Sequence, residues 1–406
     1  MEGKTYVRRA STASSPLWGK KRPLLIKLEM ELTERCNLNC IHCYINLPAE
    51  DLKAKSRELS AVRIKEILKE AASLGCLKVR FTGGEPLLRE DFEDIYIFAR
   101  KLGLKVTIFT NATLIHPRFA KLWSRIPPGE SIEVSVYGMT RKSYESVTRH
   151  RGSFAAFQRG LQLLLKKRIP FIVKGVILPQ TLGEIGEFES WASRIPQMEA
   201  APRYAMFFDL RGRRDGSKNK LIEKLRISAK EEAGIFSQRQ DEINKDLDNF
   251  CQRFLQRPSD RLFTCGAGRN SGCVDAYGKF QMCLLLRHPE TVVDLKQDSM
   301  REALNKFFPE LQKRRATNLE YLARCARCFL RGLCEQCPAK SWMESGTLDS
   351  PVEYLCEIAH ERGRRLGLLG DNERSWEVTE WKERVEKDRA ARLWPNRSPE
   401  RIRRRI

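Results

Sequence analysis

The chain has 406 residues, of which 41% are hydrophobic, so it can bury a sizeable core, and its length predicts two domains. No apolar run is long enough to span a bilayer, and residues 1–25 lack the apolar stretch of a secretory signal. Thirteen unevenly clustered cysteines are typical of a reducing compartment where thiolates hold metal, and they argue against a small disulfide scaffold. We therefore expect a cytoplasmic protein without a membrane partner.

The formal net charge is +22, and much of the excess lies in residues 211–220 and 397–406. Binding to nucleic acid is one interpretation of such a charge. No aromatic residues are interleaved with these basic runs, so we favour a solvated basic surface, such as that of a thermophile's protein or of one that meets an acidic peptide. A nucleic-acid partner is not expected.

Six repeats of one pattern, a short β-branched run followed by a turn and a helical stretch, fill the first half of the chain. The predicted strands are residues 24–32, 78–82, 105–110, 131–136, 171–177 and 203–208. The clearest helices are predicted over residues 60–75, 89–103 and 153–168. Strand and helix in alternation predict a parallel sheet in an α/β fold, a partial (β/α)6 TIM barrel, with chemistry at the carboxyl ends of the strands.

The pattern changes after residue 215, first to charged helix and then to a cysteine-rich region poor in long periodic elements. This change predicts five regions along the chain. They are a basic N-terminal extension (1–23), the partial barrel (24–215), a helical linker (216–262), a cysteine-rich domain (263–360) and a basic helical tail (361–406).

Three cysteines stand in the segment ERCNLNCIHCY, residues 34–44, directly after the first predicted strand. Their spacing is Cys-x3-Cys-x2-Cys, at Cys36, Cys40 and Cys43. Three thiolates on a tight loop can hold three irons of a [4Fe-4S] cluster and leave the fourth iron open to a ligand that is not protein. The alternative is a zinc site with His42 as fourth ligand, although the spacing is unusual for zinc.

This motif, on a loop after the first strand of a partial barrel, resembles the radical S-adenosylmethionine (SAM) superfamily. The resemblance implies that Cys36, Cys40 and Cys43 hold the SAM-binding cluster, whose unique iron binds the amino and carboxylate groups of SAM. An electron passed to SAM then cleaves a carbon–sulfur bond, and the resulting 5′-deoxyadenosyl radical abstracts hydrogen from the substrate. The electron donor implied is a flavodoxin or a ferredoxin.

The second predicted strand ends in FTGGEPLL, residues 81–88. Two glycines let backbone approach a ligand closely, and Glu85 offers an acceptor to an ammonium group. The segment resembles the superfamily's Gly-Gly-Glu-Pro segment, which carries the amino group of the methionine part of SAM. The resemblance assigns this role to Gly83, Gly84 and Glu85.

Polar residues also end the third and fourth predicted strands, where the superfamily contacts the ribose of SAM. The candidates are Asn111 and Ser135, with ordinary turn-forming residues as the alternative. Arg151 resembles the superfamily's cofactor-contacting arginine after the fourth strand, and a surface salt bridge is its alternative. The sequence identifies no catalytic acid or base.

Eight further cysteines cluster in the second region, where Gly278 precedes Cys283 as Gly-x4-Cys. The pattern resembles the SPASM extension of radical SAM enzymes, although Cys334 and Cys337 stand one residue closer than usual. The resemblance implies two auxiliary [4Fe-4S] clusters and hence three in all. One auxiliary cluster, called nearer by its expected distance from the SAM-binding cluster, would have the ligands Cys265, Cys273, Cys283 and Cys337. The other, called farther, would have Cys325, Cys328, Cys334 and Cys356. Four ligands leave no open iron, which favours electron transfer, whereas a zinc ribbon on two Cys-x2-Cys pairs would leave four cysteines unexplained.

SPASM enzymes most often modify ribosomally made peptides or proteins by thioether formation, carbon–carbon crosslinking, epimerisation or oxidation, so we expect a peptide-modifying enzyme. Leu284 stands where sulfatase-maturing relatives carry an aspartate, which disfavours that activity. The stretch before Leu24 is too short for the leader-binding winged helix of some maturases, so a separate leader-peptide-binding protein is a candidate partner. The alternatives are a radical SAM enzyme of haem or small-molecule cofactor biosynthesis and a non-catalytic iron-sulfur carrier.

Overall fold

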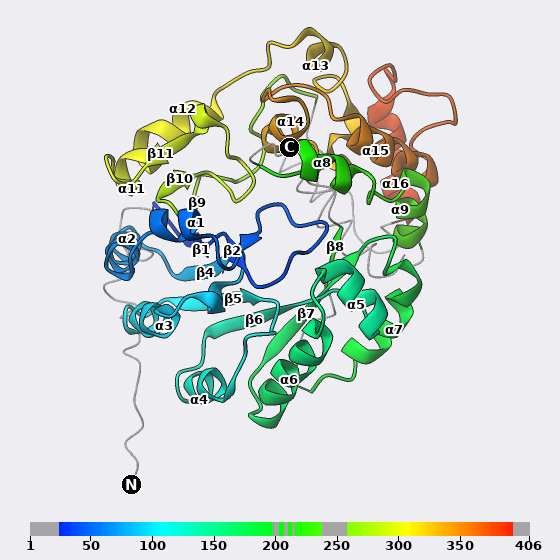
Figure 1. The fold of residues 1–406 in the computed structure, drawn as a ribbon. Helices are drawn as coiled ribbons and strands as arrows, with labels where there is room; N and C mark the ends of the chain where they lie inside the picture. The colour runs from blue at the N-terminus through cyan, green and yellow to red at the C-terminus, as the bar shows by residue number, and fades with distance from the viewer. Residues whose placement is uncertain are drawn as a thin grey trace. The chain divides into compact units, whose positions relative to one another are not determined.

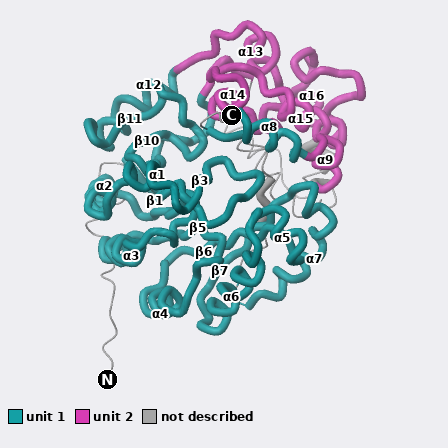
Figure 2. Tube along the Cα trace, viewed as in Figure 1, with its two compact units in different colours: residues 1–226, 263–313 teal, residues 227–262, 314–406 magenta. Residues whose placement is uncertain are grey.

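The computed structural model describes residues 24–196, 198, 203–206, 210–212, 216–237 and 258–392. The chain forms two compact units, which Figure 2 colours separately. Unit 1 comprises residues 1–226 and 263–313, and unit 2 comprises residues 227–262 and 314–406. Packing therefore groups residues 263–313 with the barrel strands. The division into five regions made from the sequence stays a prediction.

Unit 1 is built on a nine-stranded sheet in the order β11-β10-β9-β1-β4-β5-β6-β7-β8 (Figure 1). Its strands are β1 (Lys27–Thr33), β4 (Lys78–Gly83), β5 (Lys105–Thr110), β6 (Gly129–Val136), β7 (Phe171–Ile177), β8 (Arg203–Met206), β9 (Ser271–Val274), β10 (Lys279–Gln281) and β11 (Val292–Asp294). A separate pair consists of β2 (Arg35–Cys36) and β3 (Leu47–Pro48).

The six predicted strands correspond to β1 and β4 to β8, and each pairs in parallel with the next. Residues 207 and 208 of the last predicted strand lie outside the described residues. Along β1 the buried apolar residues Leu28 and Met30 alternate with the charged residues Glu29 and Glu31, so the two faces of the strand differ. The α/β fold with a parallel partial barrel is confirmed.

Along the chain, the helices of unit 1 mostly alternate with the strands of the sheet, as the sequence pattern predicts (Figure 1). They are α1 (Leu52–Arg57), α2 (Ala61–Ser73), η2 (Pro86–Leu88), α3 (Phe92–Lys101), α4 (Pro117–Arg125), α5 (Arg141–Thr148), α6 (Ser153–Lys166), η3 (Leu182–Glu184), α7 (Ile185–Ala192), α8 (Gly216–Glu223), η4 (Pro289–Thr291), α11 (Met300–Glu302), η5 (Ala303–Phe307) and α12 (Phe308–Gln312). Ser60 caps α2, as its sequence predicts, because its side chain accepts a hydrogen bond from Arg63 N–H.

Three short strands extend the sheet beyond β1, and the sequence did not predict them. Strand β9 pairs in parallel with β1, and β10 pairs with β9 and β11 in antiparallel fashion. Gly272 is required in β9, because a Cβ atom there would lie 2.4 Å from the Phe280 ring. The stretch that carries Cys273 and Cys283 is thus packed against the barrel through backbone pairing.

The described residues of unit 2 form short helices around Cys325, Cys328, Cys334, Cys337 and Cys356. They are α9 (Ala229–Ser237), α13 (Leu319–Ala323), η6 (Phe329–Gly332), α14 (Pro338–Ser345), α15 (Glu353–Arg365) and α16 (Trp381–Arg392). A buried ion pair between Arg362 of α15 and Glu232 of α9 joins two of these helices. In the part of the chain that the structure describes, no helix is both long and apolar enough to cross a membrane.

Candidate active site

The three cysteines of the predicted triplet lie at the end of β2, where Cys36 is the last strand residue, and in the loop between β2 and β3, which carries Cys40 and Cys43. This stretch, residues 36–46, is called the cysteine loop below. Two backbone N–H groups point at their sulfur atoms, that of Leu38 at 3.4 Å from Cys36 Sγ and that of Asn46 at 3.4 Å from Cys43 Sγ. Burial raises the pKa of Cys36 and Cys40 well above the ordinary range, and the neighbouring thiols raise it further. Burial therefore disfavours free thiolates here, and the iron ions of a cluster would supply the positive charge that compensates them.

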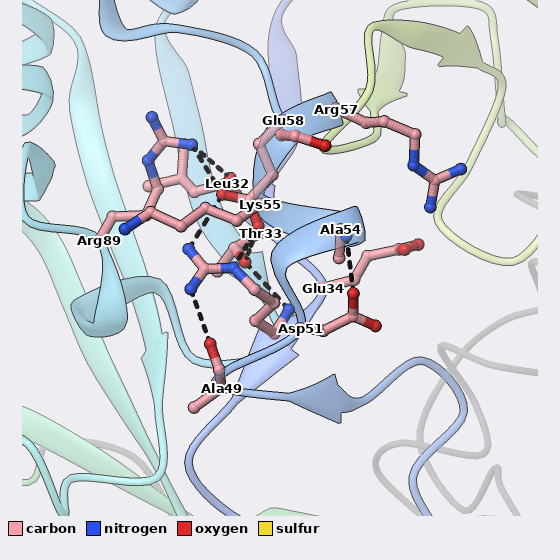
Figure 3. Close-up of polar contacts among 12 residues, drawn as sticks. Leu32, Thr33, Glu34, Ala49, Asp51, Ala54, Lys55, Arg57, Glu58 and Arg89 are labelled. Carbon is pink, nitrogen blue, oxygen red and sulfur yellow. Dashed lines mark hydrogen bonds and ion pairs between the residues drawn. The ribbon is translucent and has the colours of Figure 1, made fainter.

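Arg35, immediately before Cys36, anchors the start of this loop. Its guanidinium donates to both oxygens of Glu58, at 2.8 and 3.1 Å, and to the carbonyl of Ala49 at 2.9 Å. The hydroxyl of Thr33 also donates to Glu58, which lies just beyond α1 (Figure 3). The side chains of Arg35 and Glu58 are 8% and 6% exposed, so solvent screens this pair little and the loop has a rigid base.

Arg89 connects the same base to the segment after the Gly-Gly-Glu motif. It donates to the carbonyl of Leu32 at 3.0 Å (Figure 3). It also donates to the carbonyl of Leu59 at 3.1 Å and pairs with Asp91. One guanidinium nitrogen also lies 3.5 Å from Glu58 Oε2. A buried network of charges therefore fixes the end of β1 relative to the motif segment.

The two glycines of the motif allow a close backbone approach to the cysteine loop. A Cβ atom on Gly83 would lie 2.1 Å from the carbonyl oxygen of Thr33, and one on Gly84 would lie 2.1 Å from that of Arg35. Gly84 N–H donates a hydrogen bond to the carbonyl oxygen of Thr33 at 2.7 Å, and Glu85 N–H donates to the carbonyl oxygen of Arg35 at 3.0 Å. No larger residue fits between these segments without moving the backbone.

Glu85 is fully buried and connects the ends of β4 and β5. Its carboxylate accepts hydrogen bonds from the Thr110 hydroxyl at 2.9 Å, Leu87 N–H at 3.1 Å and Asn111 N–H at 2.8 Å. Burial raises the pKa of Glu85 to about 7. The Asn111 side chain in turn lies 3.8 Å from Cys36 Sγ. The structure thus brings Glu85, Asn111 and Cys36 together.

The remaining predicted SAM contacts are Ser135 and Arg151. Ser135 is half-buried on β6, with Lys174 of β7 as its strand partner. Arg151 is exposed in the turn between α5 and α6. The end of α5 does hold the cysteine loop, since the carbonyls of Val147 and Thr148 accept hydrogen bonds from the loop backbone.

A buried charge cluster near the cysteine loop was not predicted. Arg287, four residues past Cys283, pairs with both oxygens of Glu31 at 2.5 and 2.6 Å, and it lies 3.4 Å from Glu34. The Tyr277 hydroxyl donates to Glu34 at 2.6 Å. These contacts join the base of the cysteine loop to residues 277–287, so buried polar side chains link the two chain segments that form unit 1.

The predicted ligands of the nearer auxiliary cluster are distributed over both units. Cys265 is exposed, Cys273 is buried on β9, and Cys283 follows β10, all in unit 1. Cys337 immediately precedes α14 in unit 2. This ligand set stays a prediction.

The four predicted ligands of the farther auxiliary cluster all line one hollow of unit 2. They are Cys325, Cys328, Cys334 and Cys356. The hollow measures about 410 Å³, a volume that includes its open mouth. Burial raises the pKa of the Cys325 thiol to about 12 and that of Cys328 to about 11.

The four cysteine thiols that line this hollow are suitable ligands for an iron-sulfur cluster. Within the described residues, no group of three or more His, Cys, Asp or Glu side chains is arranged to hold a single metal ion. A four-iron cluster is larger than one ion, so its thiolates stand farther apart than those of a zinc site. Four thiols around one hollow, with the cationic side chains of Arg324 and Arg331 in its wall, suit a cluster of net negative charge.

Comparisons with known proteins agree with the fold and with the cysteine loop. Residues 30–192 match the model of the Radical SAM superfamily. The chain is 32% identical over 166 residues to Fe-coproporphyrin III synthase of Methanosarcina barkeri, a match that covers 41% of this chain and 39% of that relative. It is 24% identical over 352 residues to the subtilosin biosynthesis protein AlbA of Bacillus subtilis, covering 82% of this chain and 74% of AlbA.

Among solved structures, Streptococcus suis SuiB bound to its precursor peptide SuiA superimposes with a TM-score of 0.61 at 16% identity. That match covers 82% of this chain and 76% of SuiB. The likeness extends the agreement in fold well beyond residues 30–192. Those residues, which hold the three-cysteine loop and the Gly-Gly-Glu segment, are a domain of the Radical SAM superfamily.

Proposed function

We propose that this protein is a radical SAM enzyme that modifies a ribosomally synthesised peptide or protein with the help of two auxiliary clusters. The observation that carries the proposal is the pairing of a radical SAM domain with a second unit in which four cysteines line one hollow. An iron-sulfur carrier needs no SAM site, so the Gly-Gly-Glu segment beside the cysteine loop supports an enzyme over a carrier.

In the radical SAM domain, Cys36, Cys40 and Cys43 would hold the SAM-binding cluster, which supplies the electron for reductive cleavage of SAM. The backbone of Gly83 and Gly84 comes close to the loop, and the Glu85 carboxylate joins this segment to Thr110 and Asn111 at the end of β5. These groups would orient the methionine part of SAM.

Asn111, Ser135 and Arg151 would contact the rest of SAM. The position of Asn111 beside Cys36 Sγ supports the first of these assignments most directly.

The two auxiliary clusters would relay electrons to or from the substrate. Cys325, Cys328, Cys334 and Cys356 would hold the farther one, and Cys265, Cys273, Cys283 and Cys337 the nearer one. All irons would then carry a protein ligand, which suits electron transfer better than binding of substrate. A flavodoxin or a ferredoxin would supply electrons, and the protein would work in the cytoplasm.

A peptide substrate is favoured by relatives that match most of this chain, among them AlbA and SuiB with its precursor peptide. The net charge of +22 suits an acidic peptide partner. A haem-pathway or other small-molecule reaction is the second candidate, because the match to Fe-coproporphyrin III synthase has the higher identity, 32%, although it covers 41% of the chain.

The test is co-expression of the full chain with each candidate short peptide that the neighbouring genes encode, followed by mass spectrometry of that peptide. A crosslink removes two hydrogen atoms, oxidation changes the mass by a fixed amount, and epimerisation changes the chirality of a residue at constant mass. Modification that depends on Cys36 supports the proposal. An unmodified peptide, together with formation of iron coproporphyrin III from a tetrapyrrole precursor by the purified protein, would establish the haem-pathway alternative instead.

A further inference from the structure

The hollow of unit 2 is lined in part, through Trp376, by a segment that the sequence pattern did not connect with function. Residues 366–381, here called the cap segment, follow α15 and precede most of α16. Their apolar side chains pack on the cysteine-bearing part of the unit. The hydrophobic cluster combines Cys328, Phe329, Leu330, Leu333 and Ala359 with Leu368, Leu369 and Val385, and Cys334, Leu366, Val378 and Trp381 pack against it. The cap segment therefore shields two predicted ligands of the farther cluster from water.

One polar side chain of the cap segment reaches a cysteine. The hydroxyl oxygen of Ser375, which is fully buried, lies 2.9 Å from Cys328 Sγ. Either group can donate while the cysteine is a thiol. An iron-bound thiolate has no proton, so in the loaded protein the Ser375 hydroxyl must be the donor.

His360 holds Ser375 in place. Ser375 N–H lies 3.2 Å from His360 Nε2, which must therefore accept. The ring proton is then on Nδ1, 2.8 Å from the Cys356 carbonyl oxygen and 3.5 Å from Cys356 Sγ. One imidazole thus connects the backbone of Ser375 to the helix turn that carries another predicted ligand.

A second donor reaches a different ligand of the set, Cys356. One guanidinium nitrogen of Arg324 lies 3.7 Å from Cys356 Sγ. The same guanidinium donates to both carboxylate oxygens of Glu353, at 2.6 and 2.9 Å. Its guanidinium also stacks over the Trp376 ring of the cap segment at 4.8 Å. Hydrogen bonds to cluster sulfurs and exclusion of solvent are two of the factors that set the reduction potential of such a cluster.

We propose that the cap segment tunes the farther auxiliary cluster: Ser375, positioned by His360, donates a hydrogen bond to the Cys328 thiolate and raises the reduction potential of that cluster. Reduction adds one electron and hence one negative charge to the cluster and its thiolates, and a donor hydrogen bond stabilises the added charge. The inference rests on the proposed function, because it concerns one of the auxiliary clusters named there.

The test is a redox titration of the reconstituted full-length protein, followed by electron paramagnetic resonance (EPR), with a chemical reductant as the electron source. The signal of the farther cluster is the one that Cys328→Ala removes. In Ser375→Ala we expect the ratio of oxidised to reduced farther cluster at a fixed potential to rise about tenfold, which is about 59 mV for one electron. The iron content should stay that of the wild type.

Two variants separate tuning from a structural effect. Ser375→Thr keeps the hydroxyl and should return the potential toward that of the wild type. Ser341→Ala is the matched control, because Ser341 is equally buried in the same unit and its hydroxyl donates to the Ser350 carbonyl at 2.6 Å. Its potential should not move.

An unchanged potential in Ser375→Ala overturns the inference and leaves the proposed function standing. An equal shift in Ser341→Ala, or iron loss from Ser375→Ala that threonine does not restore, overturns it too, since the role would then be structural. If Cys328→Ala removes neither iron nor an EPR signal, the farther cluster itself is absent, and the proposed function fails in that part as well.

Discussion

Replacing Cys36, Cys40 and Cys43 together by alanine is expected to abolish formation of 5′-deoxyadenosine from SAM, down to the level without protein. These thiols are the predicted holders of the one cluster with an open iron, and they share no residue with the predicted ligands of the other two. The measurement is chromatography of 5′-deoxyadenosine after incubation of reduced, reconstituted protein with SAM.

Cys76→Ala is the matched control for this experiment. Cys76 is a buried cysteine, 6% exposed, which donates to the Lys78 carbonyl at 3.2 Å and belongs to no predicted ligand set. Its variant should still cleave SAM. Reductive cleavage by the triple variant at the wild-type rate would disprove the assignment of the loop.

Gly84→Ala is expected to lower the free energy of unfolding by about 3 kcal/mol or more, at the upper end of overpacking costs. The added Cβ atom would lie 2.1 Å from the Arg35 carbonyl oxygen and 2.7 Å from that of Glu34, and both are backbone atoms that cannot rotate away. Separation of the two segments would displace Cys36, so cleavage of SAM should also be lost. Urea unfolding and the 5′-deoxyadenosine assay measure the two effects.

Gly186→Ala provides the comparison for that variant. Gly186 lies in α7, and a Cβ atom there would meet nothing within 4 Å. Alanine is the better helix former, so this variant should gain up to about 1 kcal/mol and keep its activity. Wild-type stability and SAM cleavage in Gly84→Ala would mean that the close approach does not position the loop.

Much of the barrel could be predicted from the sequence, because the parallel strands are buried runs such as residues 105–110 and 171–177, separated by helices with clear ends at Ser60 and Gly75. The three-cysteine loop follows from its spacing and its place after β1. The closeness of Glu85, Asn111 and Cys36 could be predicted in part, because the carboxyl ends of parallel strands meet at one edge of a sheet.

Other features could not be predicted. Strands β9 to β11 are three or four residues long, and β9 pairs with a strand far away in the chain, so no local periodicity marks them. Arg35, Arg89 and Arg287 look like ordinary surface charges in a chain with 74 basic residues, and only the fold shows that each is buried against carboxylates.

The cap segment shows the same limit. Residues 361–406 read as a basic helical tail of little functional content, yet Ser375 lies beside a predicted cluster ligand. A single serine carries no pattern, and its role depends on a contact between positions 47 residues apart.

The iron content of the reconstituted full-length protein tests most directly the central claim that eleven cysteines hold three clusters. At about 4 irons per cluster, the wild type should contain about 12 irons per chain, and both the Cys36, Cys40 and Cys43 triple variant and Cys328→Ala should contain about 8. A wild-type value near 4, unchanged in Cys328→Ala, would contradict the account, because unit 2 would then hold no cluster in the hollow that its four cysteines line.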